Sequence, residues 1–339
     1  MQYKISFFLS LVLIILTFSF LKYQYFDKQI LTQDYAFFIP TDTNFEELNN
    51  HLHQIAYPLH PISKLFLDSF ISKKRLEYWF RPGRYLLSKS FSLNDIINKL
   101  RSRSQDSVDI TFNSMDNVDS FFGIISQKLE LDSITLKNYI DSINFVPDSF
   151  YFMLIPNTYE VFWNISAKDL IDRMYGEYDK FWTNDRLRLL ETIHLSKNDV
   201  FILASIVDKE ASHFDEMPRI AGLYLNRLRQ GWPLASDPTI LYILRQKSSQ
   251  IIRRVRNKHI DNTKDSRFNT YYHKGLPPKP ICIPSFQALE AVLSPEKHDY
   301  MYMCARPDRS EYHNFSKTHI EHQKNASKFH RWLDKRKIY

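Results

Sequence analysis

The sequence predicts an α+β protein in three parts: an N-terminal transmembrane helix, a small βα unit, and a larger, mostly helical domain with short strands. Three observations support this. An uncharged apolar run opens the chain, strand and helix patterns alternate up to residue 102, and helical periodicity dominates after residue 108. The expected parts are a stub over 1–4, the membrane helix over 5–21, a tether over 22–34, the small unit over 35–102 and the large domain over 108–339.

Composition excludes several classes of protein. The 339 residues are 44% hydrophobic and 24% charged, which excludes global disorder, collagen and disulfide scaffolds. The chain has six glycines and neither a G-x-G-x-x-G nor a G-x-x-x-x-G-K-[ST] motif, which argues against a nucleotide-phosphate loop. The net charge of +7 favours an anionic partner without naming it. Cys282 and Cys304 lack metal-ligand spacing, and we expect two unpaired buried thiols rather than one bridge.

The run from Ile5 to Leu21 contains no charged residue and is flanked by Lys4 and Lys22. Its 17 residues are near the lower limit for a membrane-spanning helix. A cleaved signal peptide is the alternative, but no small-residue cleavage site follows the run. We therefore expect an uncleaved single-pass anchor, whose flanking charges leave its orientation open.

Secondary structure is expected at defined places in both units. The small unit should contain strands near 36–40 and 81–87 and helices near 43–52, 62–70 and 93–100, the last capped by Ser92. A polar break over 102–107 marks the boundary. The large unit should begin with a strand at 108–112, followed by helices at 117–130, 134–141, 166–182 and 184–194.

One later helix carries the main candidate for catalysis. Ser196 and Asp199 fit a capping box, and Glu210 continues an apolar stripe made by Val200, Leu203, Ile206 and Val207. A carboxyl there either reaches water at the helix end or is held in an apolar cleft. In a cleft, desolvation would raise its pKa, as a general acid near neutral pH requires. Asp208 lies about 160° away around the helix, which predicts one catalytic carboxylate rather than a pair.

Further polar residues follow this helix. A second helix should begin at Asp215 or Glu216 and end at Gly231, with Asn226 and Arg227 near its end. The Ser236-Asp237-Pro238-Thr239 segment is a turn or a helix N-cap. The aromatic, proline-rich loop over 268–281 is typical of sugar or peptide grooves. The basic segment over 245–267 is either a solvated loop or the edge of a groove for an anionic polymer.

Taken together, these segments resemble the MltG (YceG-like) endolytic murein transglycosylases. The resemblance rests on ASIVDKE ending at Glu210, IAG at 220–222 with NRL at 226–228, SDPT at 236–239, NTY at 269–271 with GLPP at 275–278, PNTY ending at Tyr159, and HNFS at 313–316. The order and spacing of these motifs agree from the anchor to the C-terminus.

This resemblance implies a single-pass protein of the inner membrane with a cytoplasmic stub at 1–4 and its bulk in the periplasm. It also implies a LysM-like unit at 35–102, a catalytic domain at 108–339 and Glu210 as the acid/base. Substrate contacts are expected from Asn226, Arg227, Ser236, Asp237, Thr239, Asn269, Thr270, Tyr271 and Tyr159. The implied partners are murein glycan strands and peptidoglycan synthases, and the implied role is to terminate growing strands. No cofactor or metal is expected, because His213, His273 and His313 lack ligand spacing.

The sequence leaves three other functions open or weakly disfavoured. Glu210 and Asp237 could serve an inverting glycan hydrolase, with carboxyls roughly 6.5–9.5 Å apart around a water. A non-catalytic peptidoglycan-binding scaffold would need only the LysM-like unit and the basic surface. A nucleic-acid binder fits the charge but is disfavoured by the anchor and by the missing motifs.

Overall fold

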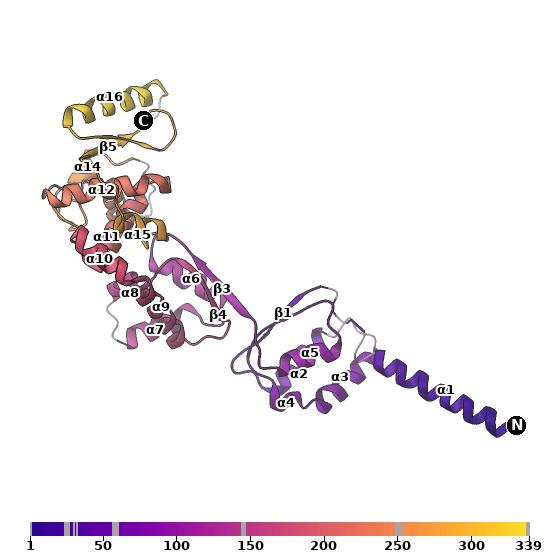
Figure 1. The fold of residues 1–339 in the computed structure, drawn as a ribbon. Helices are drawn as coiled ribbons and strands as arrows, with labels where there is room; N and C mark the ends of the chain where they lie inside the picture. Colours follow the sequence, from indigo (N-terminus) through magenta and orange to yellow (C-terminus); the bar gives the residue numbers. More distant parts are fainter. Residues whose placement is uncertain are drawn as a thin grey trace. The chain divides into compact units, whose positions relative to one another are not determined.

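The computed structural model describes residues 2–23, 28–29, 31, 33–55, 61–143, 147–247, 252 and 254–336. Its contacts divide the chain into two compact units, shown with the N-terminal helix in Figure 1. The first unit comprises Met1–Ile110, Ser126–Asp132 and Glu160–Ser166, and the second comprises the intervening segments and Ala167–Tyr339. Helices and short strands occur together, as expected for an α+β protein.

The N-terminal apolar run forms helix α1, Gln2–Lys22. Its window Ile5–Lys22 has a mean hydropathy of 2.3 and is not buried by the rest of the chain. This length and composition are compatible with a membrane anchor. Parts of the predicted tether, residues 24–27, 30 and 32, lie outside the described residues.

The first unit packs helices on a two-stranded sheet. Strands β1 (Tyr35–Ile39) and β2 (Gly83–Leu87) pair antiparallel, and helices α2 (Phe45–Ile55), α3 (Pro61–Lys73), α4 (Leu76–Trp79) and α5 (Leu93–Arg101) accompany them. Alternating side chains of the strands, Phe37 and Tyr85 among them, meet the apolar stripe of α5 in one core. Ser92 caps α5 in a capping box with Asp95. The expected strands and helices are confirmed, and α4 is an addition.

The second unit is mostly helical. Strands β3 (Ser107–Phe112) and β4 (Asn157–Phe162), each of which is divided between the two units, pair with each other. Within the second unit, β5 (Tyr302–Ala305) pairs antiparallel with β6 (His313–Ser316). The helices are α6 (Val118–Lys128), α7 (Ser133–Ser142), α8 (Pro147–Met153), α9 (Ala167–Phe181), α10 (Asn184–Ile193), α11 (Lys197–Glu210), α12 (Met217–Arg229), α13 (Asp237–Lys247), α14 (Asn257–Asp261), α15 (Phe286–Leu293) and α16 (His319–Lys335). Strand β3 and the predicted helices are confirmed to within a few residues.

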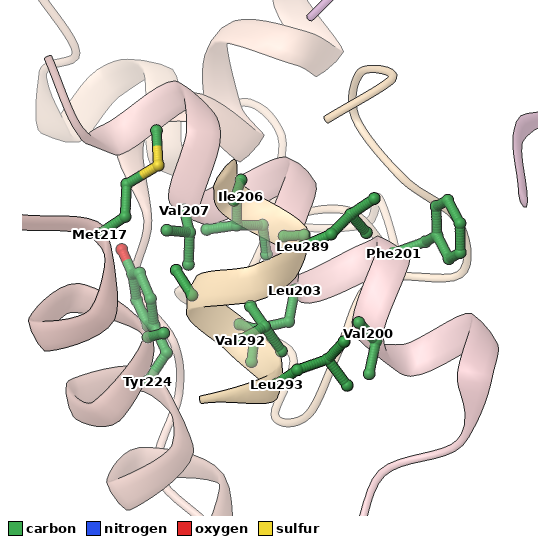
Figure 2. Packing of buried hydrophobic residues seen from close by; sticks show 14 of the residues in the cluster. Val200, Phe201, Leu203, Ile206, Val207, Met217, Tyr224, Leu289, Val292 and Leu293 are labelled. Atoms are coloured by element: carbon green, nitrogen blue, oxygen red, sulfur yellow. The ribbon is translucent and has the colours of Figure 1, made fainter. Parts of the chain in front are cut away.

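Helix α11 is the centre of the second unit. Ser196 and Asp199 form its predicted capping box. Every residue from Val200 to Val207 is buried, so the helix is enclosed on all sides and not only along one stripe. Helices α12 and α15 pack against it, and Figure 2 shows Leu289 and Val292 of α15 among the side chains of α11. The carboxyl end of this enclosed helix is Glu210, which therefore lies at the edge of the core.

A glycine sets the approach between α12 and the segment after α15. A Cβ atom on Gly222 would lie 2.4 Å from the carbonyl oxygen of Glu296 and 2.8 Å from Nε2 of His298. Moving main-chain atoms to make room for a Cβ atom costs free energy. We therefore expect Gly222→Ala to lower the free energy of unfolding by about 1–3 kcal/mol.

Gly176 in α9 provides the matched control for this prediction. A Cβ atom there has no neighbour within 4 Å. Gly176→Ala should therefore raise stability by roughly 0.5–1 kcal/mol, the usual difference between the two residues in a helix. Urea unfolding of both variants measures the difference. Equal effects of the two substitutions would refute the proposed close approach.

Candidate active site

The Glu210 carboxyl is held by two hydroxyl groups. Its Oε1 accepts hydrogen bonds from the Tyr224 hydroxyl at 2.6 Å and from the Ser236 Oγ at 3.3 Å. Tyr224 comes from the inner face of α12, and Ser236 directly precedes α13. Both donors have no exposed surface, whereas Glu210 is partly buried. Three elements thus fix this carboxyl at the end of α11.

The surroundings of Glu210 favour its protonated form. Burial raises the pKa of Glu210, and the nearby Asp237 carboxylate raises it further. The hydrogen bonds from Tyr224 and Ser236 and the charge of His313 act in the opposite direction, but the pKa remains raised overall. Burial also raises the pKa of Tyr224, so its hydroxyl keeps the proton that it donates. The second of the two cases considered from sequence, a desolvated carboxyl, is the one found.

The Ser236-Asp237-Pro238-Thr239 segment is the start of α13 and is tied to the loop at 269–271. The Ser236 amide donates to Thr270 Oγ1 at 3.0 Å, and the hydroxyls of Thr239 and Thr270 are 2.9 Å apart. The Tyr271 hydroxyl donates to Asp237 Oδ1 at 2.5 Å. Five of the residues predicted as substrate contacts therefore form one network that continues to Glu210 through Ser236.

The side chains of three other predicted contacts form hydrogen bonds with main-chain groups. Asn269, fully buried, donates to the Ile260 carbonyl at 2.8 Å, and its Oδ1 accepts from the Tyr271 amide at 3.0 Å. Asn226 donates to the carbonyls of His298 and Tyr300, and Arg227 donates to those of Met301 and Leu234. These bonds shape the loops around the site; direct contact with a substrate remains a prediction.

Tyr159 is a core residue of β4. Its ring is 1% exposed and stacks on Phe112 with centroids 5.4 Å apart. Its hydroxyl donates to the Ile155 carbonyl. The contacts of Tyr159 are thus with β3 and the segment before β4, and they do not join it to the Glu210 network.

A hydrogen-bonded pair between a buried carboxyl and a histidine supports the site and was not anticipated from sequence. His313 Nδ1 lies 2.7 Å from Glu216 Oε2, and the His313 amide donates to Glu216 Oε1 at 2.8 Å. The Glu216 side chain is 1% exposed. This pair joins the start of α12 to β6, 97 residues later, and places His313 where its charge acts on Glu210. The signal in the sequence was the HNFS motif, which gave the position of His313 but not its partner.

The neighbours of Glu210 in α11 point elsewhere. Asp208 accepts from the Ser114 hydroxyl at 2.5 Å and from the Ser285 amide at 2.9 Å, and Lys209 pairs with Asp116 at 2.8 Å. The expectation that Asp208 and Glu210 do not share one cleft is therefore confirmed. Cys282 and Cys304 are unpaired, as expected, but only Cys282 is buried; Cys304 is partly exposed, so the expectation of two buried thiols is wrong for it. Within the described ranges, no three His, Cys, Asp or Glu side chains form a metal-binding cluster.

A cavity of about 570 Å³ lies beside the site. Lys209 and Pro238, the chain neighbours of Glu210 and Asp237, contribute to its wall. Glu210 itself is not one of the residues that line it, so the sugar-sized cleft around this carboxyl remains an expectation.

Comparison with protein families matches residues 37–328 to the YceG-like family. Proteins named endolytic murein transglycosylase are similar in sequence: one from Streptococcus pneumoniae strain D39 is 26% identical over 79% of this chain and 53% of its own, and one from Bacillus subtilis is 26% identical over 77% of this chain and 79% of its own. The chain thus spans about half the length of the pneumococcal relative.

Among solved structures, a crystal structure of a protein described as YceG-like from Listeria monocytogenes has the same fold. It superposes with a TM-score of 0.55 at 23% identity and covers 86% of this chain and 98% of its own. The sequence resemblance to this group of proteins is confirmed. With the family match extending over most of its length, the chain belongs to the YceG-like family.

Proposed function

We propose that this chain is a membrane-anchored endolytic murein transglycosylase that uses Glu210 as its acid and base. The observation that carries the proposal is the partly buried Glu210 carboxyl, whose pKa is raised and which Tyr224 and Ser236 hold at the edge of the core. A carboxyl that stays protonated near neutral pH suits general acid catalysis. Family membership and the names of the relatives point to the same reaction.

In this mechanism, protonated Glu210 donates its proton to the glycosidic oxygen between N-acetylmuramic acid and N-acetylglucosamine. The bond from that oxygen to the muramic C1 breaks, and an oxocarbenium-like centre develops at C1. The Glu210 carboxylate then accepts the proton of the muramic C6 hydroxyl, whose oxygen bonds to C1 and closes a 1,6-anhydro ring. Glu210 ends protonated, and no water is consumed, so one carboxyl suffices.

The network around Glu210 has a positioning role in this proposal. Proton transfer by a well-placed group increases the reaction rate by about 10²–10⁴-fold. The rest of the rate enhancement must come from orientation of the substrate and stabilisation of the developing charge. Asp237, held by Tyr271, is a carboxylate whose charge is felt at Glu210 and is suited to stabilise the cationic centre. Ser236, Thr239 and Thr270 fix the start of α13 that carries it.

The pH profile of the reaction should respond to the groups around Glu210. Acid catalysis needs the protonated carboxyl, so the rate should fall as pH rises through the Glu210 pKa. The Tyr224 hydrogen bond lowers this pKa, and the Asp237 charge raises it. Tyr224→Phe should therefore move the alkaline limb to higher pH, and Asp237→Asn should move it to lower pH. Rates of anhydro-end release across a pH series measure both shifts.

The two substitutions control each other, because both remove a polar group beside the same carboxyl but act on its pKa with opposite sign. Shifts in the same direction, or none in either variant, would contradict Glu210 as the titrating acid.

Anchoring and location follow from the proposed function. Helix α1 would hold the chain in the inner membrane, with the first unit as a LysM-like glycan-binding module and the second as the catalytic domain in the periplasm. Acting there, the enzyme would cut nascent glycan strands beside the peptidoglycan synthases and so terminate their elongation. The basic character of the chain suits an anionic wall polymer.

The chemical identity of the new glycan ends tests this function. Mass spectrometry of murein digested by the full-length chain should find 1,6-anhydromuramic ends. Reducing ends would instead indicate a hydrolase with Asp237 as the general base. Binding without any product would indicate a scaffold.

A further inference from the structure

The cavity beside the site is a binding pocket in its own right. Its wall is built from the loop before α6, from α8, from the end of α11 and from α13. The volume of about 570 Å³ is within the usual range for pockets that hold small ligands. Lys209 and Pro238 place it one residue from Glu210 along α11 and one residue from Asp237 along α13. The wall of this pocket and the Glu210 network thus share the end of α11 and the start of α13.

Two cations and two carboxylates line the pocket, Lys209 and Arg245 against Asp116 and Asp119, so the charges of the lining cancel. Asp116 lies between the two cations: Lys209 Nζ at 2.8 Å and the Arg245 guanidinium at 3.9 Å. The hydrogen bond from Lys209 lowers the pKa of Asp116, so this carboxylate remains ionised. Asp119 is paired at 2.8 Å with Lys137, which is not part of the lining. Each carboxylate thus has a close cation, and Arg245 is the more loosely paired of the two lining cations.

Arg245 is the cation best placed to receive a ligand. Its side chain is 64% exposed, and its distance to Asp116 is near the upper limit for an ion pair. A guanidinium can bind a carboxylate through two parallel hydrogen bonds. The rings of Tyr151 and Tyr242 in the same wall provide apolar faces next to it. The pocket thus combines a carboxylate-binding group with surfaces for an aliphatic chain.

We propose that this pocket binds the peptide stem of the muramic acid residue, through a stem carboxylate on Arg245. This inference rests on the proposed function. Where murein carries its peptides, the lactyl carboxyl of muramic acid is bound in the amide to the stem, and the free carboxylates lie on the stems. A loosely paired guanidinium beside aromatic rings therefore favours the stem over a further sugar ring. It makes Arg245 a specificity-determining residue for strands that still carry their peptides.

The test is a binding experiment that does not depend on turnover. Two probes are used: the N-acetylglucosamine–N-acetylmuramic acid disaccharide with its peptide stem, and the same disaccharide without the stem and with its muramic carboxyl capped as a simple amide, so that it carries no carboxylate. Each is titrated calorimetrically into the full-length chain in detergent micelles, with Glu210→Gln as the background so that no probe is consumed. We expect the stem to tighten binding about 10-fold or more, as a charged hydrogen bond does.

Arg245→Ala in this background should abolish the advantage of the stem, and Arg245→Lys should restore part of it. Arg188→Ala is the matched control, because Arg188 is 77% exposed on α10 and pairs with Asp185. Equal affinity for both probes, including no measurable binding of either at millimolar concentration, would overturn the inference. So would a stem advantage that survives in Arg245→Ala.

The outcomes for this pocket and for the catalytic proposal can be separated. Anhydro ends from the wild-type chain together with equal binding of both probes would refute the stem pocket but support the proposed reaction. Stem-dependent binding that is lost in Arg245→Ala, without anhydro ends, would support the stem pocket but refute the proposed reaction.

Discussion

Glu210→Gln should abolish the release of anhydro ends, with a loss of at least about 10²–10⁴-fold in rate. Glutamine has nearly the same shape as glutamic acid, and its amide oxygen can still accept from Tyr224 and Ser236. It cannot donate a proton to a leaving oxygen or take one from the C6 hydroxyl. The substitution therefore removes the proposed chemistry while leaving the packing of α11 in place. Mass spectrometry of the digest, with quantified ends, measures the loss.

Glu191→Gln is the matched control, since Glu191 is an exposed carboxylate of α10 in the same unit. It should retain wild-type activity. Unfolding midpoints of both variants should stay close to that of the wild type. If Glu210→Gln keeps more than a tenth of the activity with its fold intact, Glu210 is not the acid, and the proposed mechanism fails.

Features that depend on neighbouring residues were predictable from sequence. The capping boxes at Ser92 and Ser196 are local hydrogen-bond patterns, and both occur as expected. The orientations of Asp208 and Glu210 followed from the helical period alone. The strand at 108–112 and the helix at 166–182 followed from short-range alternation and periodicity. In each case the information lies within a few residues of chain.

Features that depend on distant partners were not predictable. Tyr224 is a buried residue of α12, and its hydroxyl reaches Glu210 only because α11 and α12 pack together. The burial of α11 on every side depends on α12 and also on α15, which lies about 80 residues later and was not expected as a helix. A motif likewise identifies a residue without revealing its bonding partners. Asn226 and Arg227 bond to main-chain carbonyls that are contributed by the segment at 298–301 and by Leu234.

The Glu216–His313 pair is the most consequential of these distant contacts, and Glu216→Ala should lower the free energy of unfolding by about 1–3 kcal/mol. Glu216 accepts both from the His313 ring, 2.7 Å away, and from its main-chain amide, 2.8 Å away. Alanine would leave both groups without an acceptor where the glutamate side chain is 1% exposed. An unpaired buried donor keeps its desolvation cost.

The exposed pair of Arg219 and Glu296 is the matched control for this loss. Both side chains are 39% exposed, and the guanidinium binds the carboxylate at 2.9–3.0 Å. Water and salt screen such a pair, so Glu296→Ala should cost only about 0.2–1 kcal/mol. Urea unfolding of the two variants compares one carboxylate in the core with one at the surface of the same unit. Because the buried pair also joins α12 to β6 beside Glu210, Glu216→Ala should reduce activity as well. A Glu216→Ala variant as stable as Glu296→Ala would mean that the pair contributes no more than a surface contact, and β6 would then have to be held in place by other interactions.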